Sequence, residues 1–289
     1  MRSRLATVLV LVVGMTVLDT GVAEAVAPVP HPTGSTAHPR TAYYLALGDS
    51  AAMWNGDQSY PDVIVSNHPQ DHLQLVDMAC SGETTSSMIS GSTCAPGGSQ
   101  YQNALTFLRL HRRSMALVTI DIGGNDVVGC IDAEDPTTCF TDGLATMQTN
   151  LATILAGLRA AAGRRVPIVG MNVYDPLLGD WLAPPGPAKT LATEAIAGLT
   201  ILNNDMDEVY EAAASPIANV QQAFRVQDMS TMVRSKWGSV PLAVRTACTL
   251  LDITCHRGAA EGFGDDPNLA GAVVIARAFD KVIRIQPRG

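Results

Sequence analysis

The chain has 289 residues, of which 19 are Lys or Arg and 27 are Asp or Glu, so its formal net charge is −8. An acidic chain without a basic stripe does not fit a nucleic-acid-binding protein, because phosphate binding depends on clustered cations. Hydrophobic residues make up 47% and charged residues 16%, which is typical of a folded globular protein and excludes a disordered one.

Residues 1–25 have the three parts of a secretory signal peptide. Arg2 and Arg4 form a basic start, residues 5–18 are apolar, and Ala23-Glu24-Ala25 offers an A-x-A cleavage site. The alternative is a retained N-terminal anchor helix. No later apolar run reaches the ~18–20 residues needed to cross a bilayer, so we expect no integral membrane segment after cleavage. These features predict a secreted, extracellular protein.

Residues 26–41 are rich in Pro, Ala, Thr, Ser and His without periodicity, which indicates an exposed tether. The two histidines of this tether, His31 and His38, are interpreted as solvated side chains and not as metal ligands. Residues 42–289 are expected to form a single domain, a size that suits one α/β unit. Since we find neither metal-ligand spacing nor a phosphate-binding loop, the sequence predicts no metal and no cofactor.

Short apolar runs alternate with longer helical ones along this domain. Strands are predicted over residues 43–47, 73–76, 116–120 and 166–171, and helices over residues 101–110, 144–162, 188–214 and 268–283. This alternation favours a parallel sheet with helices on both faces. In such sheets ligands bind beyond the carboxyl ends of the strands, so the first residues after each strand are the candidates for a site.

Six cysteines remain after cleavage, and none forms a C-x-x-C pair, so disulfides are favoured over a zinc site. Six cysteines allow 15 connectivities. We predict the three sequential pairs, because each closes a short loop between periodic segments: Cys80–Cys94, Cys130–Cys139 and Cys248–Cys255.

Three strand ends carry residues suited to acyl transfer. Gly48-Asp49-Ser50 follows the first strand, Cys80-Ser81-Gly82 the second and Gly123-Gly124-Asn125-Asp126 the third. A serine hydroxyl can attack an ester carbonyl, while backbone N–H groups and an amide stabilise the oxyanion. Each residue alone also has a structural explanation, Ser50 as a helix cap, Gly82 as a turn residue and Asn125 as an Asx-turn former. Their joint occurrence after three successive strands favours a catalytic role over these structural ones.

These motifs resemble the four blocks of the SGNH hydrolase family, also called GDSL esterases and lipases. The fourth block resembles the segment from Asp265 to Gly271. The resemblance implies a three-layer α/β/α sandwich with a five-stranded parallel sheet, the flavodoxin-like SGNH hydrolase fold. It also implies that Ser50 is the nucleophile and that Ser50, Gly82 and Asn125 form the oxyanion hole.

The fourth block lacks the histidine that serves the family as general base. Asp266 stands in its place, and Phe263 stands where the partner aspartate is frequent. Asp266 could act as the base, or it could simply cap a helix that begins at Pro267. His256, in a loop beside Cys255, is the alternative base. A further departure is Trp54, which we expect to narrow or line the acyl pocket.

Two functions follow from these observations. The first is a secreted serine esterase or lipase that cleaves small-molecule or lipid carboxylic esters through an acyl-Ser50 intermediate. The second is a catalytically impaired relative that acts as an exported binding protein. Tyr174-Asp175-Pro176, after the fourth strand, is interpreted as a plain turn in preference to part of the cleft. Acyl and alcohol specificity and the oligomeric state do not follow from the sequence.

Overall fold

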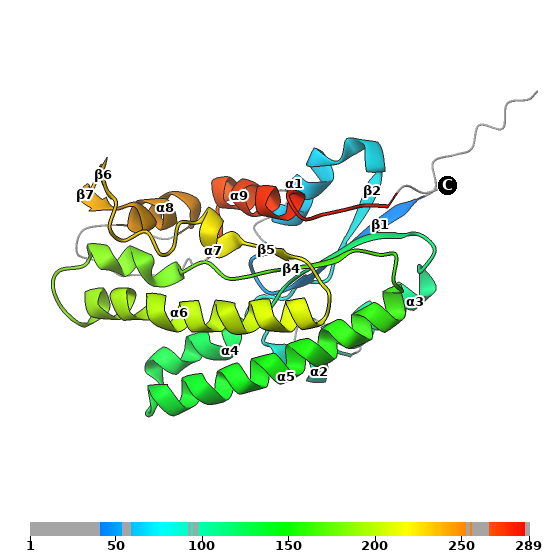
Figure 1. Cartoon of the computed structure of the whole chain (residues 1–289), viewed down its shortest axis with the longest axis horizontal. Helices are drawn as coiled ribbons and strands as arrows, with labels where there is room; N and C mark the ends of the chain where they lie inside the picture. Colours follow the sequence, from blue (N-terminus) through cyan, green and yellow to red (C-terminus); the bar gives the residue numbers. More distant parts are fainter. Residues whose placement is uncertain are drawn as a thin grey trace, which may run out of the picture. The chain divides into compact units, whose positions relative to one another are not determined.

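Five strands form one parallel sheet in the order β2-β1-β3-β4-β5 in the computed structural model of the chain (Figure 1). They are β1 (Ala42–Gly48), β2 (Leu73–Asp77), β3 (Met115–Asp121), β4 (Ile168–Met171) and β5 (Ile217–Ala218). The structure describes residues 41–53, 59–91, 94, 98–252, 255 and 266–286. The four strands predicted from apolar runs are confirmed, and the fifth, only two residues long, was not located from the sequence.

Helices cover both faces of the sheet (Figure 1). One face carries α1 (Tyr60–Asn67), α7 (Val220–Ala223), α8 (Leu242–Leu250) and α9 (Leu269–Asp280). The other face carries α2 (Thr85–Ser90), α3 (Gln100–Leu110), α5 (Pro136–Ala162) and the C-terminal half of α6 (Pro187–Ala212). This arrangement confirms the predicted three-layer α/β/α sandwich.

The remaining short elements connect these layers. They are α4 (Asn125–Val128), the 3₁₀ helices η1 (Pro69–Asp71), η2 (Gly129–Asp132) and η3 (Pro176–Leu182), and an antiparallel hairpin of β6 (Met232–Ser235) and β7 (Gly238–Pro241). Among them, α4, η2 and η3 lie near the carboxyl ends of β3 and β4, where the site is expected.

Two buried clusters, one on each face, hold the sheet to its helices. Strand β1 shows why: Tyr44 and Ala46 point into the cluster with α1 and α9, whereas Leu45 and Leu47 point into the cluster with α3 and α5. A strand buried on both faces has to be apolar at successive positions, which gives the continuous run seen in the sequence.

Helix α5 begins at Pro136, earlier than the predicted residue 144. Its start is fixed by Asp135, whose side chain accepts a hydrogen bond of 3.1 Å from the N–H of Thr138, with Pro136 in the first turn. This is a capping signal and not a periodic one, so a prediction based on apolar spacing began the helix too late.

All three predicted disulfides are present. Their Cα–Cα distances are 5.6 Å for Cys80–Cys94, 5.4 Å for Cys130–Cys139 and 5.7 Å for Cys248–Cys255. Each closes a loop of 14 residues or fewer, so the stabilisation from restricting the unfolded chain is about 3 kcal/mol or less per bond. Within the described ranges, no helix is both long enough and apolar enough to span a bilayer.

Close packing of β4 against α6 gives the first testable prediction. A Cβ atom on Gly170 would lie 2.1 Å from the ring of Tyr210, which is fully buried. We expect Gly170→Ala to lower the free energy of unfolding by about 2–3 kcal/mol, because the ring has no free volume to move into. Chemical denaturation measures the effect.

Gly129→Ala is the matched control, since a Cβ there meets no atom within 4 Å. We expect it to change the free energy of unfolding by less than about 0.5 kcal/mol. Equal effects of the two substitutions would contradict this account of the packing between β4 and α6.

Candidate active site

The end of β1 is fixed in place by Gly48. Its N–H donates to Oε1 of Gln100 at 2.8 Å, and its carbonyl oxygen accepts from Nε2 of Gln100 at 2.9 Å. A Cβ on Gly48 would lie 2.1 Å from the carbonyl oxygen of Asp121, and its φ of +139° disfavours other residues. Only glycine therefore lets β1 end directly against the end of β3.

Ser50 lies two residues beyond Gly48, in a turn closed by a hydrogen bond from the N–H of Met53 to the carbonyl of Ser50. The side chain of Asp49 holds this turn by accepting from the N–H of Ala51 at 3.1 Å. No described residue hydrogen-bonds with the hydroxyl of Ser50. In the described residues this serine does not begin a helix, because the next helix, α1, starts at Tyr60.

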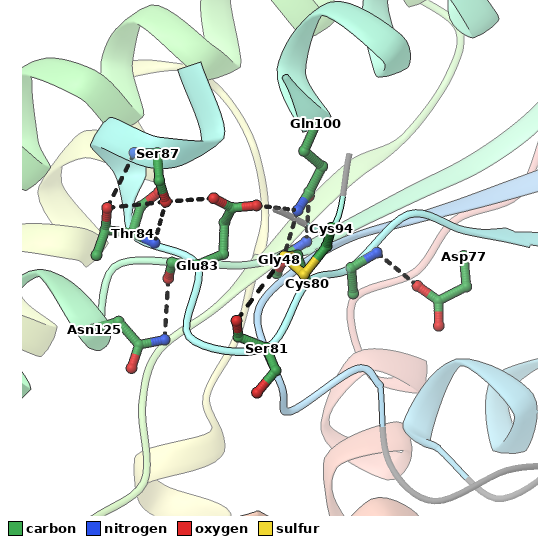
Figure 2. The surroundings of a disulfide bond; sticks show 11 residues. Gly48, Asp77, Cys80, Ser81, Glu83, Thr84, Ser87, Cys94, Gln100 and Asn125 are labelled. Carbon is green, nitrogen blue, oxygen red and sulfur yellow. Dashed lines mark hydrogen bonds between the residues drawn. A yellow bond between two sulfur atoms is a disulfide. The ribbon is translucent and has the colours of Figure 1, made fainter. Parts of the chain in front are cut away.

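The segment after β2 is joined to the end of β1 by the N–H of Cys80, which donates to the carbonyl of Gly48 at 3.0 Å, and it contains a buried carboxylate, Glu83 (Figure 2). Glu83 is almost fully buried and accepts hydrogen bonds from the hydroxyl of Ser87 and, at 3.2 Å, from Nε2 of Gln100. Because Gln100 also holds Gly48, its single amide joins the ends of β1 and β2. Gly82 is exposed and has a φ of +71°, a left-handed conformation that favours glycine.

Asn125, at the start of α4, joins all three segments. Its Nδ2 donates to the carbonyl oxygen of Glu83 at 3.0 Å and to Oδ2 of Asp49 at 3.3 Å, and the first bond is drawn in Figure 2. The next residue, Asp126, accepts from the N–H and the hydroxyl of Thr85 at 2.9 Å and 2.6 Å. Asn125 is thus in contact with the neighbours of both Ser50 and Gly82.

A buried acid lies beneath these residues. Asp121 is 1% exposed, and its Oδ1 accepts from the hydroxyl of Tyr60 at 2.5 Å. Burial raises the pKa of Asp121 well above its ordinary value, and the nearby charge of Asp49 raises it further. Both effects favour the neutral form of Asp121, which lessens the repulsion between two adjacent carboxyl groups at this end of the sheet.

Ser50 and Asn125 open into a cavity of about 480 Å³. Its walls come from α4, η2, η3, α6 and the first turns of α5, and they are largely apolar: Val127, Ile131, Phe140, Leu177, Leu199 and Met206. Asp49, Ser50, Asn125 and Asp266 are among its polar lining residues, whereas Gly82 is not part of the lining. The cavity can therefore hold an apolar group with a polar function near Ser50.

Asp266 lines the same cavity as Ser50, although it is distant in the sequence. It does not cap α9. Asn268 is the cap, since its Oδ1 accepts from the N–H of Gly271 at 3.2 Å while its Nδ2 donates to the carbonyls of Thr249 and Leu251. The capping alternative for Asp266 is therefore wrong, because the asparagine amide both caps α9 and ties it to the end of α8.

Several sequence-based candidates lie outside the described residues. These are the alternative base His256, the departures Trp54 and Phe263, Asp265, and the tether residues His31 and His38. Among the residues that the structure does describe, no three His, Cys, Asp or Glu side chains are grouped so that they could hold a metal ion.

Asp175 is a second buried acid that lines the cavity. It is 2% exposed, and its Oδ1 accepts from the N–H of Leu177 at 2.9 Å at the start of η3, whereas its Oδ2 has no hydrogen-bond partner among the described residues. Burial, aided by the charge of Asp180, raises the pKa of Asp175 to about 6. The interpretation of residues 174–176 as a plain turn is incomplete, because all three line the cavity.

Three buried residues organise the site, and the sequence did not identify them as buried site residues: Glu83, Gln100 and Asp121. Glu83 and Gln100 gave no pattern that separates a buried polar residue from a surface one. Asp121 did carry a signal, since it is an acid at the end of an otherwise apolar strand, a position where a charged residue is rare unless it has a partner.

The chain belongs to the GDSL-like Lipase/Acylhydrolase family, which it matches over residues 46–236. This confirms the resemblance drawn from the motifs and identifies the chain as a hydrolase of the lipase and esterase kind. No curated protein matches the sequence.

Solved structures share the fold at low sequence identity. Phospholipase A1 from Streptomyces albidoflavus is 16% identical, with a TM-score of 0.54, over 83% of this chain and 99% of that chain. The extracellular lipase from Streptomyces rimosus is 15% identical, with a TM-score of 0.52, over 84% and 100%. An alpha/beta hydrolase enzyme from the metagenome of Lake Arreo is 18% identical, with a TM-score of 0.52, over 82% and 93%. These likenesses concern the fold alone.

The buried carboxyl of Asp175 gives a prediction about stability and pH. Its pKa in the folded protein, about 6, lies above the ordinary value of 3.8, so folding favours the protonated form. The resulting stability is fully present below about pH 4 and is lost as the pH rises through 6. Since two pKa units correspond to about 3 kcal/mol, we expect Asp175→Asn to raise the free energy of unfolding by up to that amount at pH 7 and hardly at all at pH 4. Denaturant unfolding at both pH values measures this.

Asp135→Asn is the control of opposite sign. Asp135 is exposed, and its hydrogen bonds from Thr138 lower its pKa, so its carboxylate stabilises the folded state more as the pH rises. If Asp175→Asn lowered the free energy of unfolding at pH 7, the buried carboxyl of Asp175 would not destabilise the folded protein, and the prediction would be wrong.

Proposed function

We propose that the chain is an exported serine esterase that hydrolyses carboxylic esters through an acyl-Ser50 intermediate. The observation that carries the proposal is the shared cavity: Ser50, Asn125 and Asp266 line one space with apolar walls. A nucleophile, an amide donor and a proton acceptor beside an apolar pocket are the groups that ester hydrolysis requires.

In the first step, Oγ of Ser50 attacks the ester carbonyl carbon while its proton passes to the base. The backbone N–H of Ser50 and Nδ2 of Asn125, which line the cavity, donate to the resulting oxyanion; the family resemblance adds the backbone N–H of Gly82, which lies outside the lining. For Asn125 this means that one N–H turns from Oδ2 of Asp49, its longer hydrogen bond, towards the substrate. The intermediate then collapses, and the alcohol leaves with the proton held by the base.

In the second step, water attacks the acyl-Ser50 ester, and the same base takes a proton from that water. The tetrahedral intermediate collapses by breaking the bond to Oγ of Ser50. The serine regains its proton, and the carboxylic acid product leaves the cavity. The reaction needs no cofactor.

Asp266 is the proposed base within the described part of the chain, and His256 remains the alternative. A free aspartate has a pKa near 3.9 and a histidine near 6.5, so the aspartate has a deficit of about 3.5 kcal/mol in proton affinity. This corresponds to two to three decades in rate. We therefore expect slow turnover if Asp266 is the base.

The apolar walls of the cavity favour an acyl ester, either a small molecule or a lipid. Export is proposed from residues 1–25, with residues 26–41 as a tether and residues 42–289 as the domain. Three disulfides in the described chain support export, because they persist in oxidising compartments.

Replacing the nucleophile tests the proposal. We expect Ser50→Ala to lower the hydrolysis of short-chain p-nitrophenyl esters by at least about 1,000-fold, since no acyl-enzyme can form. Ser86→Ala, which removes a hydroxyl from α2 outside the cavity lining, serves as the control. Unchanged hydrolysis by Ser50→Ala would rule out the mechanism.

A second candidate function is an exported binding protein, and the aspartate at the position of the family's histidine favours it. A fluorophosphonate probe distinguishes the two functions, since it labels only an activated serine. Labelling that is lost in Asp266→Asn supports Asp266 as the base, and labelling lost only in His256→Ala supports His256. Absence of labelling at every pH, together with a large gain of turnover in Asp266→His, would favour the binding protein.

A further inference from the structure

The cavity beside Ser50 follows one face of α6 over most of the length of that helix. Its lining residues on α6 recur every few positions from Leu191 to Met206, and a stretch of helix of that length spans about 22 Å. The Met206 end lies at the site, because a Cβ atom on Gly123, two residues before Asn125, would lie 3.6 Å from Cε of Met206. The cavity is therefore elongated, and it leads away from the oxyanion donor along α6.

Gly198 lies on this face of α6, about 12 Å along the helix from Met206. A Cβ atom on Gly198 would lie 3.5 Å and 3.6 Å from two ring carbons of Phe140 on α5, which also lines the cavity. Apart from the adjacent parts of α6 itself, no other described atom would lie within 4 Å of that Cβ. Since 3.5 Å is an ordinary contact distance, alanine would fit at position 198 in the helical backbone.

Glycine at position 198 therefore has no explanation in packing, unlike the other glycines within the described α-helices. At each of those, a Cβ atom would lie 2.6 Å or less from an atom of a neighbouring residue, so packing requires glycine: Gly143, Gly157 and Gly271. Glycine destabilises the interior of a helix relative to alanine. At Gly198 this cost leaves open space in the cavity that contains Ser50.

We infer that Gly198 keeps the cavity open for the acyl chain of the substrate, so that the protein prefers esters of extended fatty acyl groups to acetyl esters. This rests on the proposed function, because it names the substrate class of that same site. Gly198 and Phe140 are the residues that determine the specificity, since they bound the same part of the cavity from opposite helices. Only an extended acyl group occupies both this part and the end at Met206.

The acyl group is assigned to this space, and not the alcohol, because of the order of the two reaction steps. The alcohol leaves after the first step, whereas the acyl group stays bonded to Oγ of Ser50 until water releases it. Asn125, the oxyanion donor, begins α4, and Val127 and Val128 of the same short helix continue the lining. An apolar wall therefore starts directly beside the position of the acyl carbonyl group.

Two p-nitrophenyl esters test the inference on the complete protein, the octanoate and the acetate. Each methylene group that the cavity buries can raise kcat/KM by up to about fourfold. We expect kcat/KM for the octanoate to exceed that for the acetate at least about tenfold. The ratio of these two values is the quantity that the variants below should change.

Substitutions on α6 connect this ratio to Gly198. We expect Gly198→Leu to lower the ratio at least about tenfold, whatever the absolute rates, because the new side chain fills the space beside Phe140. Ala197→Leu is the matched control, since it adds the same side chain at an exposed position of α6 outside the lining, and it should keep the wild-type ratio. Phe140→Ala, added to Gly198→Leu, is expected to raise the ratio again by making room for the chain.

Gly198→Ala tests whether the glycine serves the cavity or the packing of the helix. We expect this substitution to lower the ratio by about two- to fourfold and to raise the melting temperature by about 2–4 °C, because alanine stabilises α6. A lower melting temperature would show that packing requires the glycine, and it would overturn the inference.

Binding of octanamide and acetamide to Ser50→Ala, measured by calorimetry, separates this inference from the proposed function. Tighter binding of octanamide that Gly198→Leu abolishes, without any ester turnover by the wild-type protein, would overturn the esterase and support the chain-binding role of the cavity. Ester turnover with a ratio that Gly198→Leu leaves unchanged, or that Ala197→Leu lowers equally, would support the esterase and overturn that role. A preference for octyl acetate over ethyl acetate, without one for the octanoate over the acetate, would place the chain on the alcohol and also overturn the inference.

Discussion

The site depends on the close approach of the ends of β1 and β3, which a glycine at position 48 permits. Without a side chain there, the backbone of β1 lies against Asp121, and Gln100 bonds to both polar groups of Gly48. Through Gln100 and Asn125, the three strand ends become one network in which each hydrogen bond fixes the next. The positions of Ser50 and of the amide donor are therefore set by backbone packing, and not by flexible surface loops.

The same packing buries carboxyl groups at the ends of the strands, and it raises the pKa values of two of them, Asp121 and Asp175. Asp121 and Glu83 are almost fully buried, and both lie between hydrogen-bond donors, whereas Asp175 has one oxygen satisfied and one without a partner in the described chain. Burial raises the pKa of Asp121 and of Asp175, so these two carboxyls cost stability wherever they must ionise. That cost is located at the carboxyl edge of the sheet, where the site is, while the two apolar clusters on either face supply the stability.

The sequence predicted the parts of the structure that depend on local patterns. Apolar runs located the first four strands, and the short spacing between successive cysteines located the disulfides. The motifs at the strand ends indicated that Ser50 and Asn125 share a site, and both line the same cavity. It did not predict features set by tertiary contacts. The two-residue strand β5 has too few residues for a pattern, and the polar residues Gln100 and Asp175 are distinguished only by the neighbours that bury them. The start of α9 shows the limit of capping signals, because Asp266 and Asn268 are both residue types that favour the N-cap position. Asn268 is the cap in the structure, and its side chain also donates to the carbonyls of Thr249 and Leu251, which only the fold brings near.

The acidic residues that line the cavity oppose the proposed ester hydrolysis, since the tetrahedral intermediate carries a negative charge. At an effective dielectric constant near 20, a carboxylate about 8 Å away opposes an oxyanion by about 2 kcal/mol. Burial raises the pKa of Asp121 and so favours its neutral form, and in the proposed mechanism the N–H groups that donate to the oxyanion offset the remaining repulsion.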